Sequence, residues 1–377
     1  MPTASRPVLW VIAALLLMTP LTAAAAPASQ LLSPASQPDG RKLFQENCAA
    51  CHGENASGDR KPSDLGFDFP MPNFTDCSFA TREADGDWAS TIHRGGRARA
   101  FPRQMPAWDE ALGDDEIDAI IAFLRTRCAK PGWPRGEFNL PLAMFTEKAF
   151  PEDEVYNQTE FNTEGPAGFT NTTIFEKRFG KRGQLEVNLP ISSVYDGTRM
   201  QTGISDMGVA WKQNILADVD QGTIFSLLGE AVLPTGNARK GLGDGVFQFE
   251  THALFAQLLP QDFFLQGDIT GVFPTGANLP DAGEARFGFG RTFAEDDGWG
   301  RAWTPQVELL TAHDFTPGAG IDWDIVPQLQ VSLSARQHML LSIGERIPLN
   351  DRATRKPQFV MYLIWDWYDA GLLQGWR

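Results

Sequence analysis

Apolar and polar positions alternate with different periods in the two halves of the chain. Over residues 114–127 apolar side chains recur every three or four positions behind a cluster of acidic residues, which predicts an amphipathic helix. The same period predicts shorter helices over residues 40–47 and around Trp88 and Ile92. From Glu154 onward the period is two, which predicts β-strands. The pattern therefore predicts an all-α N-terminal region followed by an all-β antiparallel region.

The alternating half divides into about twelve segments, each about ten residues long and bounded by Gly, Pro, Asn or Asp. The segments start near residues 155, 170, 183, 206, 222, 245, 262, 284, 301, 321, 337 and 356. An even number of such segments is typical of a transmembrane β-barrel, whose apolar face meets lipid. We expect a water-filled lumen to solvate the charges of the opposite face, which are Glu250, Asp268, Arg286, Glu308, Asp322, Asp324 and Asp366.

A soluble β-sandwich or propeller shows the same kind of alternation. Sandwich strands average about five to six residues, which is shorter than these segments, and no blade-sized repeat is visible. We therefore favour an outer-membrane-type barrel of about 12 strands. Its aromatic girdle at the membrane interfaces would come from Trp299, Trp303, Trp323, Trp365 and Trp367.

Composition adds an export signal and a set of boundaries. Arg6, a short apolar run and a small-residue site near Ala26 predict a cleaved signal peptide. The formal net charge of −15 argues against a nucleic-acid partner, because such proteins need a field of Lys and Arg. We expect a signal peptide over residues 1–26, a flexible leader over 27–39, a helical domain over 40–130, a connector over 131–153 and the barrel over 154–377.

The strongest chemical motif is Cys48-Ala49-Ala50-Cys51-His52. In an exported chain this spacing is that of a c-type haem attachment site, in which both cysteines form thioethers and the histidine ligates iron. A zinc site would need a second ligand pair, which Cys77 and Cys128 do not form. A thioredoxin-like site would need a βαβ pattern around the motif, and no such pattern surrounds it. We therefore predict one haem c, attached through Cys48 and Cys51 and ligated by His52.

Two Met-Pro pairs follow this motif, Met71-Pro72 and Met105-Pro106, and the second lies just before the 114–127 helix. Over residues 40–130 the arrangement resembles class I c-type cytochromes, whose signature is Cys-x-x-Cys-His and a Met-Pro loop ahead of the last helix. The resemblance implies that Met105 is the second axial ligand of the iron. Met71 and His93 remain alternatives, and Met105 as a core-filling residue is a third.

Two further features of this region have chemical interest. Arg94, Arg97, Arg99 and Arg103 form a basic cluster that would contact haem propionates or an acidic redox partner, or would be a solvated loop. Cys77 and Cys128 lie outside the haem motif, and we expect a disulfide between them in an exported domain.

The alternating half also carries Gly-rich hairpin motifs: residues 229–236 (GEAVLPTG), residues 241–245 (GLGDG) and residues 272–276 (VFPTG). By these motifs, residues 155–370 resemble outer-membrane barrels of the MetA-pathway phenol-degradation type. One departure is that the chain runs past Trp365-Asp366-Trp367-Tyr368 to Trp376-Arg377 and does not end on an aromatic residue. His252, His313 and His338 show no spacing that pairs them with other ligands, so we interpret them as lumen or loop residues.

These features predict an electron-transfer protein and not an enzyme. We expect a single-haem cytochrome domain in the periplasm, tethered to the outer membrane by the barrel, with periplasmic redox proteins and outer-membrane lipids as partners. An alternative is a barrel transporter or porin for small, perhaps aromatic, molecules with an accessory cytochrome domain. A haem oxidase with an open sixth position is a third hypothesis, which Met105 ligation would disfavour.

Overall fold

The computed structural model describes residues 38–366 except 129–132, 277–278 and 295–301. The predicted signal peptide over residues 1–26, almost all of the leader, Trp299 and Trp367 lie outside the described residues. In the described part of the chain, no helix is both long enough and apolar enough to cross a membrane.

The N-terminal region is all helical, as its 3.6-residue period predicts. The predicted helices over 40–47 and 114–127 form with those bounds, and the segment around Trp88 and Ile92 is a ten-residue helix. The α-helices are α2 (Gly40–Asn47), α3 (Ala49–His52), α4 (Cys77–Ala80), α5 (Asp85–Arg94) and α6 (Asp114–Arg127), and the 3₁₀ turns are η1 (Pro62–Leu65), η2 (Gly96–Arg99) and η3 (Gly136–Phe138).

The first helix is fixed by its cap and by its approach to α6. The Asp39 carboxylate accepts hydrogen bonds from the backbone N–H groups of Arg41 and Lys42, both at 3.1 Å, which satisfies two donors of the first turn of α2. Gly40 lies against α6, because a Cβ atom at this position would be 1.8 Å from the carbonyl oxygen of Ala119. Glycine is therefore what lets the two helices approach so closely.

The helical region encloses an apolar core that a disulfide ties together. Cys77 at the start of α4 is bonded to Cys128 just after α6, with the two Cα atoms 5.3 Å apart. The predicted disulfide is therefore present. The buried residues of the core are Phe44, Ala49, Ala56, Ala80, Trp88, Ile92, Leu112, Ile117, Ile120, Ile121 and Leu124.

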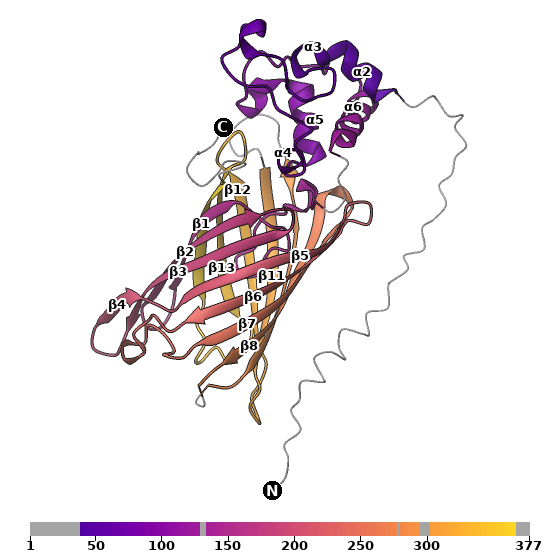
Figure 1. Cartoon of the computed structure of the whole chain (residues 1–377). Coiled ribbons are helices and arrows are strands. Elements are labelled where there is room, and N and C mark those ends of the chain that lie inside the picture. Colours follow the sequence, from indigo (N-terminus) through magenta and orange to yellow (C-terminus); the bar gives the residue numbers. More distant parts are fainter. Residues whose placement is uncertain (1–37, 129–132, 277–278, 295–301, 367–377) are drawn as a thin grey trace. The chain divides into compact units, whose positions relative to one another are not determined.

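The C-terminal region is a closed antiparallel β-barrel (Figure 1). Each strand pairs with its neighbours in chain order, and β1 pairs with β14 from Glu154↔Asp366 to Asn162↔Gln358, which closes the barrel. The strands are β1 (Glu154–Asn162), β2 (Gly168–Phe179), β3 (Gly183–Tyr195), β4 (Met200–Ile204), β5 (Met207–Asp218), β6 (Thr223–Leu233), β7 (Gln248–Leu258), β8 (Phe263–Pro274), β9 (Ala282–Arg291), β10 (Phe293–Ala294), β11 (Ala302–Asp314), β12 (Asp322–Ser332), β13 (Met339–Pro348) and β14 (Gln358–Asp366); two 3₁₀ turns, η4 (Ala238–Lys240) and η5 (Pro260–Asp262), join strands.

Two of these strands are short extensions of a neighbouring strand and do not cross the barrel wall separately. β4 pairs with the end of β3 in line with β5, and β10 pairs with the start of β11 in line with β9. Without these two strands, twelve strands form the barrel wall in the described part of the chain. The predicted architecture, a helical cytochrome-like region followed by a 12-stranded antiparallel barrel, is confirmed.

The two faces of the barrel differ as the period-two pattern predicts. The outward face is apolar: Trp211 is 45% exposed and Trp365 is 52% exposed, and Trp303 and Trp323 also point outward. The inward face carries many polar residues, of which several charged ones are fully buried, Asp268 and Glu308 among them. It also carries apolar residues such as Leu254 and Phe264, which pack against apolar residues of the connector. This distribution is the inverse of a soluble sandwich, whose apolar face is inside.

The lumen is not filled with water alone, which corrects our expectation. The connector runs through it, and its apolar residues Leu142 and Met144 are buried against barrel residues such as Tyr362. The Glu308 carboxylate accepts the backbone N–H groups of Met144 (2.8 Å) and Thr146 (2.7 Å) and the Thr146 hydroxyl (2.7 Å). Protein donors therefore satisfy this lumen charge in place of solvent.

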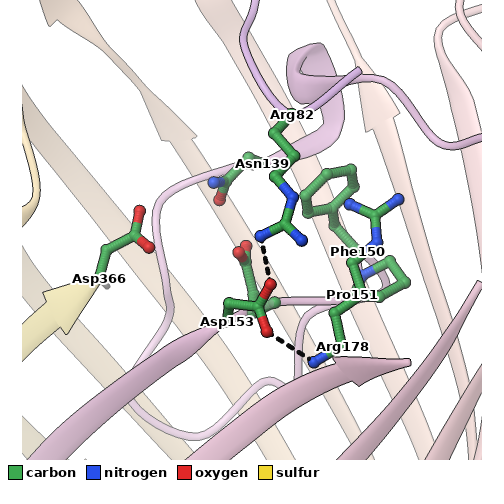
Figure 2. A pocket seen from close by; sticks show the side chains of 8 residues that line it. Arg82, Asn139, Phe150, Pro151, Asp153, Arg178 and Asp366 are labelled. Carbon is green, nitrogen blue, oxygen red and sulfur yellow. Dashed lines mark hydrogen bonds and ion pairs between the residues drawn. The ribbon is translucent and has the colours of Figure 1, made fainter. Parts of the chain in front are cut away.

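The connector also meets the barrel wall where β1 begins (Figure 2). Figure 2 shows Asp153 between the side chain of Arg82, with which it forms an ion pair, and the backbone N–H of Arg178, from which it accepts a hydrogen bond at 2.9 Å. Asp153 also pairs with Lys177 at 2.5 Å. The pocket at this place has a volume of about 10 Å³, so it has room for one water molecule at most.

Candidate haem site

The Cys-x-x-Cys-His motif lies where the first helix ends and a single helical turn begins. Cys48 closes α2 through its N–H, which donates to the Phe44 carbonyl at 2.8 Å, and His52 is the last residue of α3. The His52 N–H donates to the Cys48 carbonyl at 3.0 Å. This hydrogen bond holds Cys48, Cys51 and His52 on one helical turn, as the thioether chemistry requires.

The side chains of this turn fit a covalently held haem. Cys48 and Cys51 are free thiols, whereas Cys77 and Cys128 are bonded to each other. Burial, with the neighbouring Cys51, raises the pKa of Cys48 to about 11, so this thiol is neutral near pH 7. Burial lowers the pKa of His52, so its imidazole is neutral and has a lone pair to give to a metal. Nδ1 of His52 is buried without a hydrogen-bond partner.

Aromatic side chains surround this turn. The Phe74 ring lies with its centroid 5.8 Å from that of His52 and 5.1 Å from that of Trp88, edge to face with the latter. Trp88 also carries the guanidinium of Arg125 over its ring, 3.8 Å from the centroid. Neither Phe74 nor Arg125 is predictable from the sequence as part of the site, because a loop phenylalanine and a helix arginine carry no motif of their own.

The Met-Pro loop near residue 105 packs against the same core. Met105 is half-buried there, and its carbonyl accepts the N–H of Gly96 at 3.0 Å. Gly95 has φ +71°, and a Cβ atom on it would lie 2.8 Å from the Ala107 nitrogen, so this turn needs glycine. Trp108 donates its N–H to the Ile92 carbonyl at 3.0 Å, which ties the loop to α5.

The alternative ligands have other neighbours. The backbone of Met71 lies beside Gly58, where a Cβ atom would be 2.7 Å from the Met71 carbonyl oxygen. Nε2 of His93 lies 3.3 Å from the Asp114 carboxylate. Met105 as the second ligand of the iron stays a prediction, with Met71 and His93 as its alternatives.

The four arginines near this site do not form one surface. Arg94, Arg97 and Arg103 are exposed, as a basic docking surface requires. Arg99 is buried and pairs with the Asp87 carboxylate at 2.6 Å. Arg99 therefore joins η2 to α5 and is not part of the exposed cluster.

Comparison with known proteins agrees with this geometry. Residues 35–124 match the family described as "Cytochrome C oxidase, cbb3-type, subunit III". The protein "Cbb3-type cytochrome c oxidase subunit FixP" of Bradyrhizobium sp. (strain ORS 278) is 34% identical over 87 residues, which cover 23% of this chain and 26% of that protein. The FixP of Rhizobium meliloti (strain 1021) is 28% identical over 89 residues, with the same coverage. The chain thus spans about a quarter of these curated relatives. Its helical region is a cytochrome c-type domain, and this family implies haem c.

Solved structures resemble the other half of the chain. The KdgM porin in complex with disordered oligogalacturonate has a TM-score of 0.37 and 8% identity, and covers 56% of this chain and 98% of its own. The NanC porin has a TM-score of 0.39 and 7% identity, with the same coverage. The resemblance to the MetA-pathway phenol-degradation type stays a prediction.

Proposed function

We propose that this protein is a single-haem c-type cytochrome that transfers one electron at a time in the periplasm, tethered to the outer membrane by its barrel. The observation that carries the proposal is the helical turn of Cys48, Cys51 and His52, with two free thiols and a buried, neutral imidazole inside a cytochrome c-type domain. Haem bound there supplies one reversible electron between ferric and ferrous iron.

In this proposal the residues of the site have separate roles. Cys48 and Cys51 would hold the haem covalently, and His52 would ligate its iron. Met105 would be the second ligand, and a thioether there would raise the reduction potential relative to a second histidine. The apolar core of the helical domain excludes water from the site, and the exposed Arg94, Arg97 and Arg103 attract an acidic redox partner.

The proposed role of the barrel is that of an anchor. Its outward face exposes a belt of large apolar side chains, which a soluble protein would bury. A closed barrel leaves no unpaired strand edge in lipid. The connector lies inside the lumen and is held there by apolar contacts and by hydrogen bonds to Glu308, which favours an anchor over the alternative of an open porin for small aromatic molecules.

The test of the anchor is the mobility of the full chain on gels, with and without boiling, stained for covalently bound haem. We expect a haem-positive band in the outer-membrane fraction that shifts on boiling, because a detergent-stable barrel runs faster than the unfolded chain. A haem-positive band in the soluble periplasm that does not shift would contradict the anchor.

The test of the ligand is Met105→Ala, with Met71→Ala as its matched control. We expect Met105→Ala to change the visible spectrum of the haem and to lower its reduction potential, and Met71→Ala to leave both unchanged. The reverse result would assign the ligand to Met71, and no change in either variant would point to His93.

A further inference from the structure

Two glutamates face each other inside the barrel. Glu230 on β6 and Glu250 on β7 are direct register partners, and His252 follows two positions later on the same face of β7. One ligand atom each from Glu230, Glu250 and His252 lies within 4.8 Å of the others. Like charges directly opposite each other destabilise a strand pair, so this arrangement calls for a positive partner.

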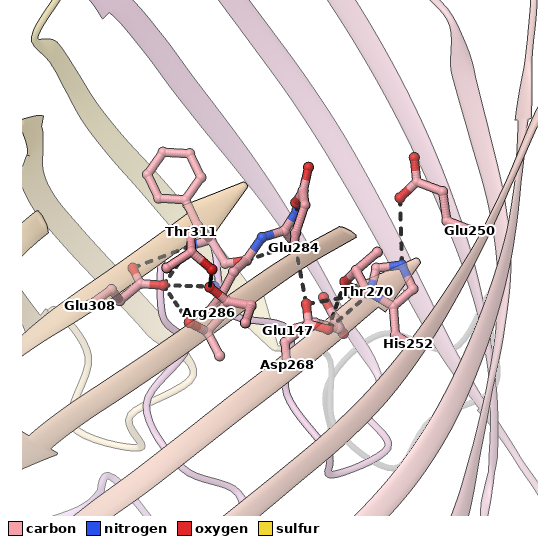
Figure 3. Close-up of polar contacts among 12 residues, drawn as sticks. Glu147, Glu250, His252, Asp268, Thr270, Glu284, Arg286, Glu308 and Thr311 are labelled. Carbon is pink, nitrogen blue, oxygen red and sulfur yellow. Dashed lines mark hydrogen bonds and ion pairs between the residues drawn. The ribbon is translucent and has the colours of Figure 1, made fainter. Parts of the chain in front are cut away.

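His252 is oriented toward these carboxylates by a second set of residues (Figure 3). It is 7% exposed, and its Nδ1 lies 3.2 Å from the Asp268 carboxylate and 2.9 Å from the Thr270 hydroxyl. Asp268 is held in turn by Arg286 at 3.2 Å. With Nδ1 donating to Asp268, Nε2 carries the lone pair. A carboxylate that orients a histidine in this way is the usual support of a metal-ligating imidazole.

The Nε2 atom of His252 is buried and has no hydrogen-bond partner. It lies 3.6 Å from a Glu250 oxygen, a contact that Figure 3 marks and that is an ion pair only when the imidazole is protonated. That distance is beyond hydrogen-bonding range, and the Glu230 carboxylate lies within the same cluster. Two carboxylates and an imidazole nitrogen form a ligand set that suits divalent zinc or manganese.

A second acidic cluster in the same lumen has a positively charged side chain as its partner. Glu176 and Glu186 are also direct register partners, and Glu147 of the connector lies with them. There the fully buried Lys212 pairs with Glu147 and supplies the positive charge. Within the described residues, no lysine or arginine forms an ion pair with Glu230 or Glu250.

The barrel leaves space at the first cluster. A cavity of about 310 Å³ is lined by Glu230, Glu250 and His252 together with connector residues. Gly208 makes room for the Glu230 carboxylate, because a Cβ atom there would lie 1.8 Å from its Oε1. The cavity therefore has room for a cation and several bound waters beside the three side chains.

We propose that Glu230, Glu250 and His252 bind a divalent transition-metal cation inside the barrel, with Zn²⁺ as its simplest representative. The site is separate from the haem and involves no redox step, since Zn²⁺ has no redox chemistry. The rival arrangement is a protonated His252 that bridges Asp268 and Glu250 by itself, in which case no cation binds.

The test measures zinc in the full-length, haem-loaded protein in detergent, by elemental analysis after equilibrium dialysis against Zn²⁺. We expect zinc in the wild-type protein and loss of this zinc in Glu250→Gln and His252→Ala. Asp268→Asn, which removes the support of the imidazole, is expected to weaken binding about 10- to 100-fold.

The matched control is His313→Ala, because His313 is a barrel histidine near the end of β11 whose Nδ1 lies 3.0 Å from the Gly320 carbonyl. It is expected to retain wild-type zinc. Each variant is checked for the heat-modifiable band, and Glu230→Gln replaces any variant that lacks it. Absence of zinc in the wild-type protein, or wild-type binding by a folded Glu250→Gln variant, would overturn the proposal. The haem stain of the same samples reports the proposed function independently.

Discussion

The two halves of this chain differ in which side chains they bury and which they expose. The helical domain has an apolar interior, in which Phe44 and Ile117 are at most 1% exposed. The barrel interior buries charged side chains, of which Lys212 and Glu308 are fully buried, beside apolar clusters that contain the connector. Its exterior is apolar, and Leu227 there is 47% exposed. The chain thus combines a helical domain with an apolar core and a barrel whose apolar outer face is suited to contact with lipid.

The comparison shows that a buried charge has a different meaning in each half. In the helical domain a charge beside Phe44 or Ile117 would have apolar neighbours, and the buried Arg99 is instead paired with the Asp87 carboxylate of α5. In the barrel the connector brings backbone N–H groups to such a charge, and Glu308 accepts several of them. The barrel interior therefore depends on hydrogen bonds to its charges in addition to the apolar packing on which the helical domain depends, and the following changes test this difference.

The largest effect is expected from the covalent link of the helical domain. Replacing both Cys77 and Cys128 by serine opens a loop with a sequence separation of 51 residues. We expect a loss of about 4 kcal/mol of unfolding free energy, seen in denaturant titrations followed by haem absorbance. The heat-modifiable mobility of the barrel should not change, and a lower transition temperature there would show that the two halves unfold together.

The second test removes the charge that holds the connector in the lumen. Glu308→Gln places an amide where Met144 and Thr146 direct their N–H groups, which leaves buried donors unsatisfied. We expect a loss of about 3 kcal/mol in barrel stability, measured by urea unfolding in detergent. Glu345→Gln on β13, where the side chain is exposed, is the control and should change little. Equal effects of both changes would argue against a specific role of the lumen contacts.

The third test concerns the outward face. Leu227→Arg in the middle of β6 puts a charge into the lipid-facing belt, and we expect it to cost about 2 kcal/mol in lipid vesicles. Leu259→Arg is the control, because Leu259 lies in the turn after β7, where a charge reaches water. If the two variants were equally stable in vesicles, the apolar belt would not be in lipid.

The smallest effect is expected at the first helix of the cytochrome domain. Asp39→Ala removes the carboxylate that caps α2, and we expect a loss of about 1 kcal/mol in the unfolding of this domain. Asp39→Asn should retain nearly all of the stability, because asparagine caps as well as aspartate. If Asp39→Asn lost as much unfolding free energy as Asp39→Ala, the effect would come from the charge of Asp39 and not from capping.

The fold was largely predictable because its elements follow local periods. The helices over 40–47 and 114–127 were predicted with their observed bounds, and the strand predicted near residue 183 begins at Gly183. Period-two alternation also gave the number of strands and the direction of each face. The small helix α4 was missed, because four residues show no period.

The place of the connector was not predictable from local patterns. Its residues show no sustained period, and the partners of Thr146 and Leu142 lie more than 150 residues away, in β11 and β14. For the same reason the sequence predicts His252 only as a lumen or loop residue without a partner ligand. Only the register of β6 with β7 brings Glu230 beside it, and no spacing along the chain reveals that register.

The pairing of β1 with β14 has a consequence for the time course of assembly. The barrel closes only when Glu154 meets Asp366, so almost the whole chain must be available before closure. Contacts between positions so far apart in sequence form slowly, whereas a small helical domain folds quickly. We therefore expect the cytochrome domain to fold first and the connector to be enclosed as the last strand joins the first. A chain that stalled before β14 would carry a finished cytochrome domain on an open sheet, with two unpaired edges exposed to aggregation.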